Sequence, residues 1–219
     1  MRKPKNIQST TTHIPNGWRR VRISDLCVQD RRIIEPGSDM AIQLPYLSLE
    51  HIESGTGRIL RDVAVPSNGE GKSTTFAFDT RHVLYGKLRP YLNKVALPDF
   101  AGRCTTELIP LLPCENVSRK YLACLLRQPA TVTAAMREKT GSRMPRENMF
   151  HVLARHVLIP QDLSLQDRVA DELERRMCAI EKARKALKDQ LDLLDLLAMR
   201  FLDDFPESIS DIWPEEHNG

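Results

Sequence analysis

The chain has 219 residues, a hydrophobic content of 41% and a formal net charge of +3, which allows one or two domains with a buried core. No run of eighteen apolar residues is present, and residues 1–12 are basic and polar rather than an apolar signal core, so we expect no membrane span and a cytoplasmic location. The cysteines, Cys27, Cys104, Cys114, Cys124 and Cys178, are odd in number and never closer than ten residues, which indicates reduced thiols rather than a disulfide framework or a zinc site.

The charge is unevenly distributed along the chain. Residues 1–160 hold 24 Lys and Arg against 14 Asp and Glu, a net charge of +10, whereas residues 161–219 hold 8 against 15, a net charge of −7. A basic globular part suits a polyanion such as nucleic acid, because Lys and Arg placed against phosphates release condensed counterions. Charge alone leaves open the alternative that these residues only solvate the surface.

Residues 17–160 are predicted to form a strand-rich domain after a flexible segment at 1–16. The strands are expected near 61–65, 74–78, 82–84, 94–97 and 105–112, separated by Pro and Gly turns. Helices are expected later, from a Ser118 cap through 126, from Pro129 to about 139, and near 146–153. A last strand at 156–160 is expected before the C-terminal part.

The C-terminal part is predicted to be one long helix over 161–205, followed by an acidic tail at 206–219. Apolar residues recur at a seven-residue interval: Leu173, Ile180, Leu187, Leu194 and Phe201. Ser164 is the expected N-cap and Pro206 ends the helix. A rod of roughly 60 Å is too long for its own small domain to cover, so we expect another helix along it, from the same protein or a partner. The alternative is that the helix folds back on its own domain.

The sequence contains no recognised catalytic motif. Gly71-Lys72-Ser73 resembles the end of a P-loop, but Pro66 stands where the first glycine is required, and 75–78 is predicted as a strand rather than a helix. The six histidines lie in no zinc-enzyme pattern. The glycine-rich segment with Lys72, Ser73 and Thr74 remains a hypothetical backbone contact for DNA.

Several segments together resemble one protein family. The stretch from His82 to Lys94, HVLYGKLRPYLNK, is followed by GRCTTE at 102–107, and GWRRV opens the domain at 17–21. With Tyr46-Leu47, TGS at 140–142, Met144-Pro145 and VLIP at 157–160, they resemble the target-recognition domain of type I restriction-modification DNA specificity subunits. In that family this domain ends in an Ile-Pro-rich strand, then a glutamine and a long helix, matched here by Ile159-Pro160 and Gln166. The ordered set covers residues 17 to about 203.

The resemblance implies a fold and a division of labour. The fold is α+β: a mixed β-rich target-recognition domain followed by a long C-terminal coiled-coil helix. A non-catalytic subunit is expected, with no cofactor or metal in this chain. S-adenosylmethionine is expected on the DNA methyltransferase (modification) subunits, and ATP and Mg²⁺ on partner subunits that include the restriction/translocase subunit. Double-stranded DNA is the expected ligand.

One departure from the family changes the expected assembly. A usual specificity subunit carries two recognition domains and two antiparallel helices, whereas this sequence carries one of each. The resemblance therefore implies half a subunit that works as an antiparallel homodimer and reads an interrupted, palindromic target, one half per copy. The lead-in to the helix, PQDLSL at 160–165, also departs from the family's pattern.

Candidate DNA-facing residues follow from the need for cations at phosphates and polar groups at base edges. The expected cluster is Lys87, Arg89, Tyr91 and Lys94, with Lys72, Arg103, Arg143 and Arg146 as weaker candidates. The structural alternatives are that Tyr91 and Pro90 hold a turn and that Lys94 pairs with a carboxylate. Two other functions stay open: a recognition module of another restriction or phage-defence methyltransferase system, and a coiled-coil scaffold that binds protein.

Overall fold

The computed structural model describes residues 14–60, 73–137 and 149–203. The chain divides into two units, residues 1–173 and residues 174–219, and each is described by itself. The first unit is a mixed α+β domain, and the described part of the second is helical throughout. The predicted α+β fold class with a long C-terminal helix is thus confirmed.

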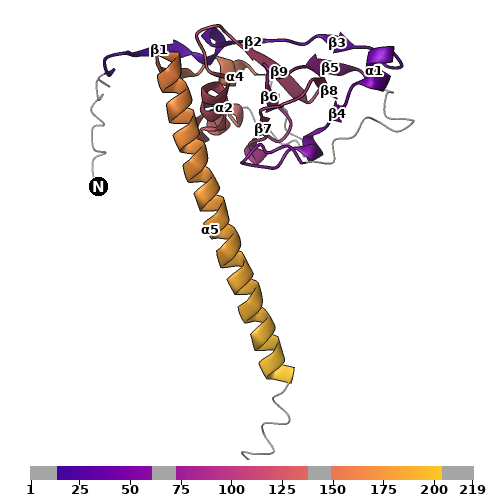
Figure 1. Ribbon diagram of the computed structural model, residues 1–219, viewed down its shortest axis with the longest axis vertical. Coiled ribbons are helices and arrows are strands. Elements are labelled where there is room, and N and C mark those ends of the chain that lie inside the picture. Colours follow the sequence, from indigo (N-terminus) through magenta and orange to yellow (C-terminus); the bar gives the residue numbers. More distant parts are fainter. Residues whose placement is uncertain (1–13, 61–72, 138–148, 204–219) are drawn as a thin grey trace, which may run out of the picture. The chain divides into compact units, whose positions relative to one another are not determined.

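Within the described residues, the strands of the first unit form three small sheets (Figure 1). The first sheet pairs β1 (Trp18–Arg22) with β10 (His156–Pro160). The second has the order β2 (Cys27–Gln29), β9 (Leu108–Pro113), β6 (Val83–Gly86), β7 (Val95–Ala96). The third has the order β3 (Ile33–Ile34), β5 (Thr75–Phe78), β8 (Gly102–Thr105), β4 (Tyr46–Leu47). All pairs are antiparallel except β4 with β8, which is parallel.

Two apolar clusters form the core of the domain. The larger cluster packs side chains of β6, β9 and β10 against α2 (Arg119–Arg127), α3 (Pro129–Ala135) and α4 (Phe150–Leu153). The smaller one lies among the strands of the third sheet and their neighbours, around Leu47, Phe78 and Leu108. Figure 1 shows α2 and α4 at the β1 end of the domain and α1 (Asp39–Gln43) at the opposite end. The short 3-10 helices are η1 (Ile23–Asp25), η2 (Leu49–His51) and η3 (Pro90–Leu92).

Helix α2 forms where its cap and its apolar spacing predict it. The hydroxyl of Ser118 accepts a hydrogen bond from the backbone N–H of Tyr121 at 3.2 Å, which satisfies one of the free donors of the first turn. Tyr121, Leu122, Leu125 and Leu126 are buried on one face, as an amphipathic helix requires. The predicted Ser118 cap is confirmed.

Most predicted strands are confirmed, with shifted ends. Strands β5, β6, β7, β9 and β10 lie at or beside the predicted positions, whereas the predicted strand at 61–65 lies outside the described residues. Of the helix predicted near 146–153, residues 146–148 lie outside the described residues, and α4 (Phe150–Leu153) confirms its second half. The sequence did not predict β1 to β4 or separate β8 from β9. Strands β3 and β4 have two residues each, too short for an alternating pattern to be recognised.

Helix α5 runs from Leu163 to Asp203, beginning in the first unit and continuing through the second. The expected N-cap was wrong by two residues: the carboxylate of Asp162 accepts from the backbone N–H of Ser164 at 3.0 Å and from its hydroxyl at 2.7 Å. This bonding lowers the pKa of Asp162 below its ordinary value. An anion at the helix N-terminus also interacts favourably with the helix dipole.

Candidate DNA interface and helical seam

The loop that joins β6 to β7 carries the predicted DNA-facing cluster, and we call residues 87–94 the 87–94 loop. Its ends are closed by backbone hydrogen bonds, from Gly86 N–H to Lys94 C=O at 2.9 Å and from Lys87 N–H to Glu107 C=O at 3.0 Å. Arg89 (φ 51°) and Asn93 (φ 49°), which flank η3, both adopt the left-handed conformation. That conformation costs a non-glycine residue about 1–2 kcal/mol, so the surrounding structure must impose it.

Neighbouring segments impose the conformation of the 87–94 loop. The amide of Asn93 donates to the carbonyl of Arg127 at 3.0 Å, and the guanidinium of Arg127 donates to the carbonyl of Val95 at 2.6 Å. On the other side, the N–H of Gly55 donates to the carbonyl of Leu92 at 3.1 Å. The loop is therefore held between the end of α2 and the turn at 53–58, before any ligand is bound.

Gly57 makes this close approach possible. Its φ is +69°, and a Cβ there would lie 1.7 Å from the carbonyl oxygen of Val95 and 2.4 Å from the guanidinium of Arg127. Only glycine fits such a position. Sequence reasoning missed Gly57, Asn93 and Arg127 as positioning residues, although the Gly55-Thr56-Gly57 triplet was a visible signal of an unusual turn.

The predicted DNA-facing residues differ in how far they reach solvent. Arg89 is exposed, Tyr91 is 51% exposed and Lys87 is partly exposed, so these three side chains lie on the accessible part of the loop. The side chain of Lys94 instead contacts a neighbouring segment of the domain. Its ammonium donates to the carbonyl of Leu49 at 2.6 Å, and burial lowers the pKa of Lys94. Lys94 thus connects the loop to η2 through a backbone carbonyl. The alternative prediction from the sequence was that Lys94 pairs with a carboxylate.

Among the weaker candidates, Arg103 lies within the described residues and does not join this cluster. Arg103 is fully buried, and its guanidinium lies 4.8 Å from the ring centroid of Tyr46, a cation–π geometry. A side chain without exposed surface offers DNA no contact in this conformation, so Arg103 is not part of the proposed interface. Lys72, Arg143 and Arg146 lie outside the described residues. Ser73 and Thr74 are exposed at the start of β5.

A buried histidine lies beside the turn before β6. His82 is fully buried; its Nδ1 lies 3.0 Å from the backbone N of Asp79, and its Nε2 lies 3.1 Å from a carboxylate oxygen of Asp30. Arg81 hydrogen-bonds the Asp79 carboxylate at 2.7 Å, and this bond holds the pKa of Asp79 well below its ordinary range. The cluster joins the ends of β2 and β5 to β6 and thereby supports the strand that leads into the 87–94 loop.

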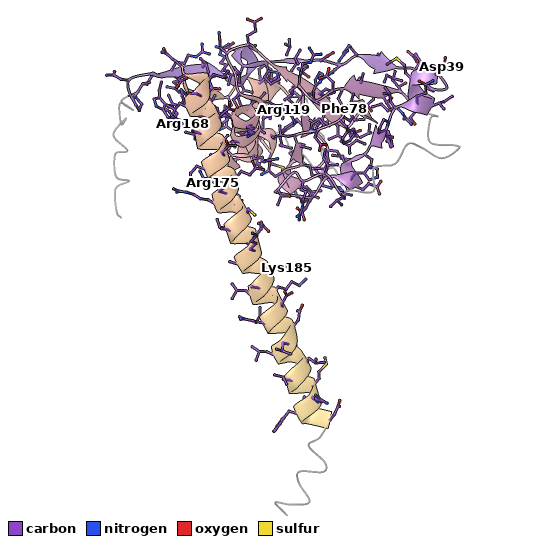
Figure 2. All side chains as sticks on the ribbon, in the orientation of Figure 1. Asp39, Phe78, Arg119, Arg168, Arg175 and Lys185 are labelled. Atoms are coloured by element: carbon purple, nitrogen blue, oxygen red, sulfur yellow. The ribbon has the colours of Figure 1, made fainter. Side chains whose placement is uncertain are left out.

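Helix α5 carries the predicted heptad face. We call the residues at its alternating spacing of four and three the seam: Leu173, Met177, Ile180, Arg184, Leu187, Leu191, Leu194, Ala198 and Phe201. Its large apolar members are between 44% and 68% exposed, and Figure 2 shows side chains standing out from the helix along this segment. Arg184 interrupts the apolar face and hydrogen-bonds Glu181 one turn earlier at 3.4 Å. Of the five predicted dimerisation residues, none is buried within the chain.

Comparison with known proteins shows related sequences and folds, although no protein-family model matches the chain. A segment of 101 residues, 45% of the chain, is 30% identical to the type I restriction enzyme EcoDI specificity subunit of Escherichia coli and covers 21% of that protein. The HsdS subunit from Thermoanaerobacter tengcongensis superimposes with a TM-score of 0.66 over 96% of the chain at 18% identity. A structure that describes the assembly and conformational transition of a type I restriction-modification system gives a TM-score of 0.66 over 94% at 19% identity.

The chain is similar in sequence and fold to type I specificity subunits. The resemblance predicted from the ordered segments is confirmed. The chain spans about half the length of the solved structures that it matches, 52% and 53%.

Within this specificity-subunit fold, the glutamine that the resemblance singled out has a visible role. Gln166 is fully buried in the first turns of α5. Its carbonyl accepts from the backbone N–H of Ser118 at 2.8 Å, and its amide donates to the carbonyls of Pro160 at 2.9 Å and Asn116 at 3.1 Å. The hydroxyl of Ser118 also donates to Asp167. Gln166 therefore fastens the start of α5 to the end of β10 and the start of α2.

The described residues contain neither a candidate metal site nor a candidate membrane-spanning helix. Within 14–60, 73–137 and 149–203, no group of His, Cys, Asp and Glu side chains is arranged to hold a metal ion. In the same ranges, no helix combines the length and the apolar character that crossing a membrane demands.

Proposed function

We propose that this chain is the non-catalytic, DNA-reading component of a type I restriction-modification complex, and that its domain recognises one half of an interrupted target. The observation that carries this proposal is the similarity of fold over 94–96% of the chain, joined to the 30% identity with a specificity subunit. The likeness includes both the β-rich domain and the long helix. A domain net charge of +10 over residues 1–160 supports a polyanionic ligand.

The 87–94 loop is the proposed point of contact with DNA. Lys87 and Arg89 supply cations for phosphates or base edges, and Tyr91 supplies an exposed ring with a polar end. The loop is fixed by Asn93 and Arg127, so little conformational entropy remains to be lost on binding. Ser73 and Thr74 at the start of β5 are accessory candidates for backbone contacts.

A paired charge deletion tests this interface. Replacing Lys87 and Arg89 together by Ala should weaken binding to a mixed-sequence duplex of about 30 base pairs. It should also reduce the slope of log affinity against log salt by about 2, one for each phosphate that the variant no longer neutralises. Fluorescence anisotropy of a labelled duplex at several salt concentrations measures both quantities.

The control variant is Lys182→Ala with Lys185→Ala, which removes the same charge from exposed positions of α5 that lie off the seam. It should leave the salt slope within about 0.5 of the wild-type value. Equal slopes for the two double variants would remove the 87–94 loop from the interface.

The proposed working unit is an antiparallel homodimer formed through the seam, which is exposed in the single chain. It would dock methyltransferase subunits that bind S-adenosylmethionine and a restriction/translocase subunit that uses ATP and Mg²⁺, in the cytoplasm. Two identical readers related by a two-fold axis recognise a palindromic, interrupted sequence. Mapping methylated adenines in cells that carry the system tests this symmetry, because an asymmetric motif would contradict two identical readers.

A further inference from the structure

The homodimer leaves open which residues of the two helices face each other. Building on that proposed homodimer, we propose that two copies of α5 pair antiparallel in one register, with the two-fold axis passing between Arg184 and Leu187. The facing pairs in each half of this dimer are Arg184 with Leu187, Ile180 with Leu191, Met177 with Leu194, and Leu173 with Ala198. The seam's spacing, its covered end and its flanking charges each support this register.

The polar residue in the seam favours the antiparallel orientation. In a parallel pair, equivalent residues share a layer, so the two Arg184 guanidinium groups would meet in the middle of an apolar interface. In an antiparallel pair, Arg184 lies beside Leu187 of the other copy. Its aliphatic stem can cover that leucine while the guanidinium reaches solvent, where Glu181 of its own helix already hydrogen-bonds it.

The domain sets one limit on the register. The heptad spacing continues toward the N-terminus through Ala170 and Gln166, and both residues are buried within the first unit. Leu173 is therefore the first seam residue available to another helix. Sliding the partner by one heptad toward the N-terminus would place Leu194 against Ala170, which is already covered. In the proposed register Leu173 to Ala198 of each copy face only uncovered seam residues, whereas Phe201 lies level with the covered Ala170, beyond the paired part.

Flanking charges oppose a shift in the other direction. In the proposed register, Glu181 of each copy lies beside Lys188 of the other, giving two attractive pairs. A shift of one heptad toward the C-terminus would place Lys188 beside Lys188 and Glu181 beside Asp195. A shift of two heptads pairs Lys188 with Asp195 but leaves Leu173, Met177 and Ile180 uncovered. The two unfavourable pairs in the proposed register, Glu174 of each copy with Asp195 of the other, lie near its solvent-exposed ends, where salt screens them.

Distance measurement between two spin labels tests the register directly. The variant Glu174→Cys, in a full-length chain whose exposed Cys114 and Cys178 are replaced by Ser, carries one label on each copy. At 1.5 Å of rise per residue, the proposed register separates the labels by about 35 Å, a shift of one or two heptads by about 45 or 55 Å, and a parallel pair by less than about 20 Å. Any distance other than the first overturns the register.

A charge exchange provides a second, independent test. Lys188→Glu should weaken dimerisation by about tenfold, since it turns two attractive pairs into repulsive ones. Adding Glu181→Lys should restore the dimer. A dimer that stays weak after Glu181→Lys is added would overturn the proposed register. Sedimentation measured over a range of protein concentrations gives the dimer affinity of each variant.

The outcomes also separate this inference from the proposed function. A monomer at all concentrations would overturn the homodimer together with its register. DNA binding that still depends on Lys87 and Arg89 would then leave the reading function intact, because that assay concerns the 87–94 loop and not the seam.

Discussion

Gln166 offers the sharpest test of how the recognition domain holds its helix. Replacing it by Leu keeps the helix propensity and a similar volume but removes all three hydrogen bonds to the backbone. The N–H of Ser118 and the carbonyl of Pro160 are buried at these contacts, so both lose their partners without gaining water. The carbonyl of Asn116 is at the partly buried edge, where water can replace the amide.

The expected loss follows from these two buried groups. Leaving one buried donor or acceptor unsatisfied costs about 1–3 kcal/mol, and the apolar leucine returns about 1 kcal/mol by its own burial. We expect Gln166→Leu to lower the free energy of unfolding by about 3 kcal/mol, a large share of the total for a domain of this size.

Urea denaturation followed by the fluorescence of Trp18 measures this loss, because β1 pairs Trp18 with Pro160, next to the site. Replacing Trp213 by Phe makes the signal specific to the first unit. The matched control is Gln161→Leu, five positions earlier, where the side chain is exposed and only the backbone N–H is bonded; it should change stability by less than about 0.5 kcal/mol. Equal stabilities of the two variants would refute the anchoring role of Gln166.

Two further changes have defined outcomes. Burial raises the pKa of Tyr121 to about 12 in the folded protein, whereas the pKa in the unfolded chain is about 10. The stabilisation that comes from the neutral, buried phenol is therefore complete below pH 10 and is lost as the pH rises toward 12. The wild type should therefore lose about 1 kcal/mol more than Tyr121→Phe between pH 8 and pH 11; parallel urea-derived pH profiles would contradict the assignment. Gly57→Ala should cost at least about 2 kcal/mol, since it adds a clash with Val95 to the strain of positive φ. The control Gly37→Ala, with a φ of +74° but open space around it, should cost only about 1 kcal/mol. If thermal denaturation gave both variants the same decrease in melting temperature, the clash at Gly57 would be shown to be relieved.

Features with a local cause were predictable from the sequence. The Ser118 cap and the apolar spacing of α2 act within one or two turns, and the heptad face of α5 repeats often enough to be recognised. The expected helix cap failed by two residues because Ser164 and Asp162 are both good cap residues. Asp162 has the advantage of a charge that favours the helix N-terminus.

Features that depend on pairing across the chain were not predictable. In sequence Arg103 is a cation like Arg89, but the parallel pairing of β4 with β8 sets it opposite Tyr46 and buries it. Lys94 was expected to face DNA, and its carbonyl partner Leu49 comes from a segment 45 residues away. Neither burial nor such a partner has a local sequence signal. The DNA contact at the 87–94 loop therefore stays a prediction, and the structure gives Lys94 and Arg103 contacts within the domain instead.

The way the 87–94 loop is held has a consequence for how target preference can diverge. The backbone hydrogen bonds that hold the loop involve Gly86, Lys87 and Leu92, and its side-chain hydrogen bonds to neighbouring segments come from Asn93 and Lys94. None of these bonds involves the side chain of Arg89, which is exposed. Substitutions of that side chain can accumulate without breaking the bonds that hold the loop. Related proteins can therefore recognise different DNA sequences with a loop of the same backbone conformation.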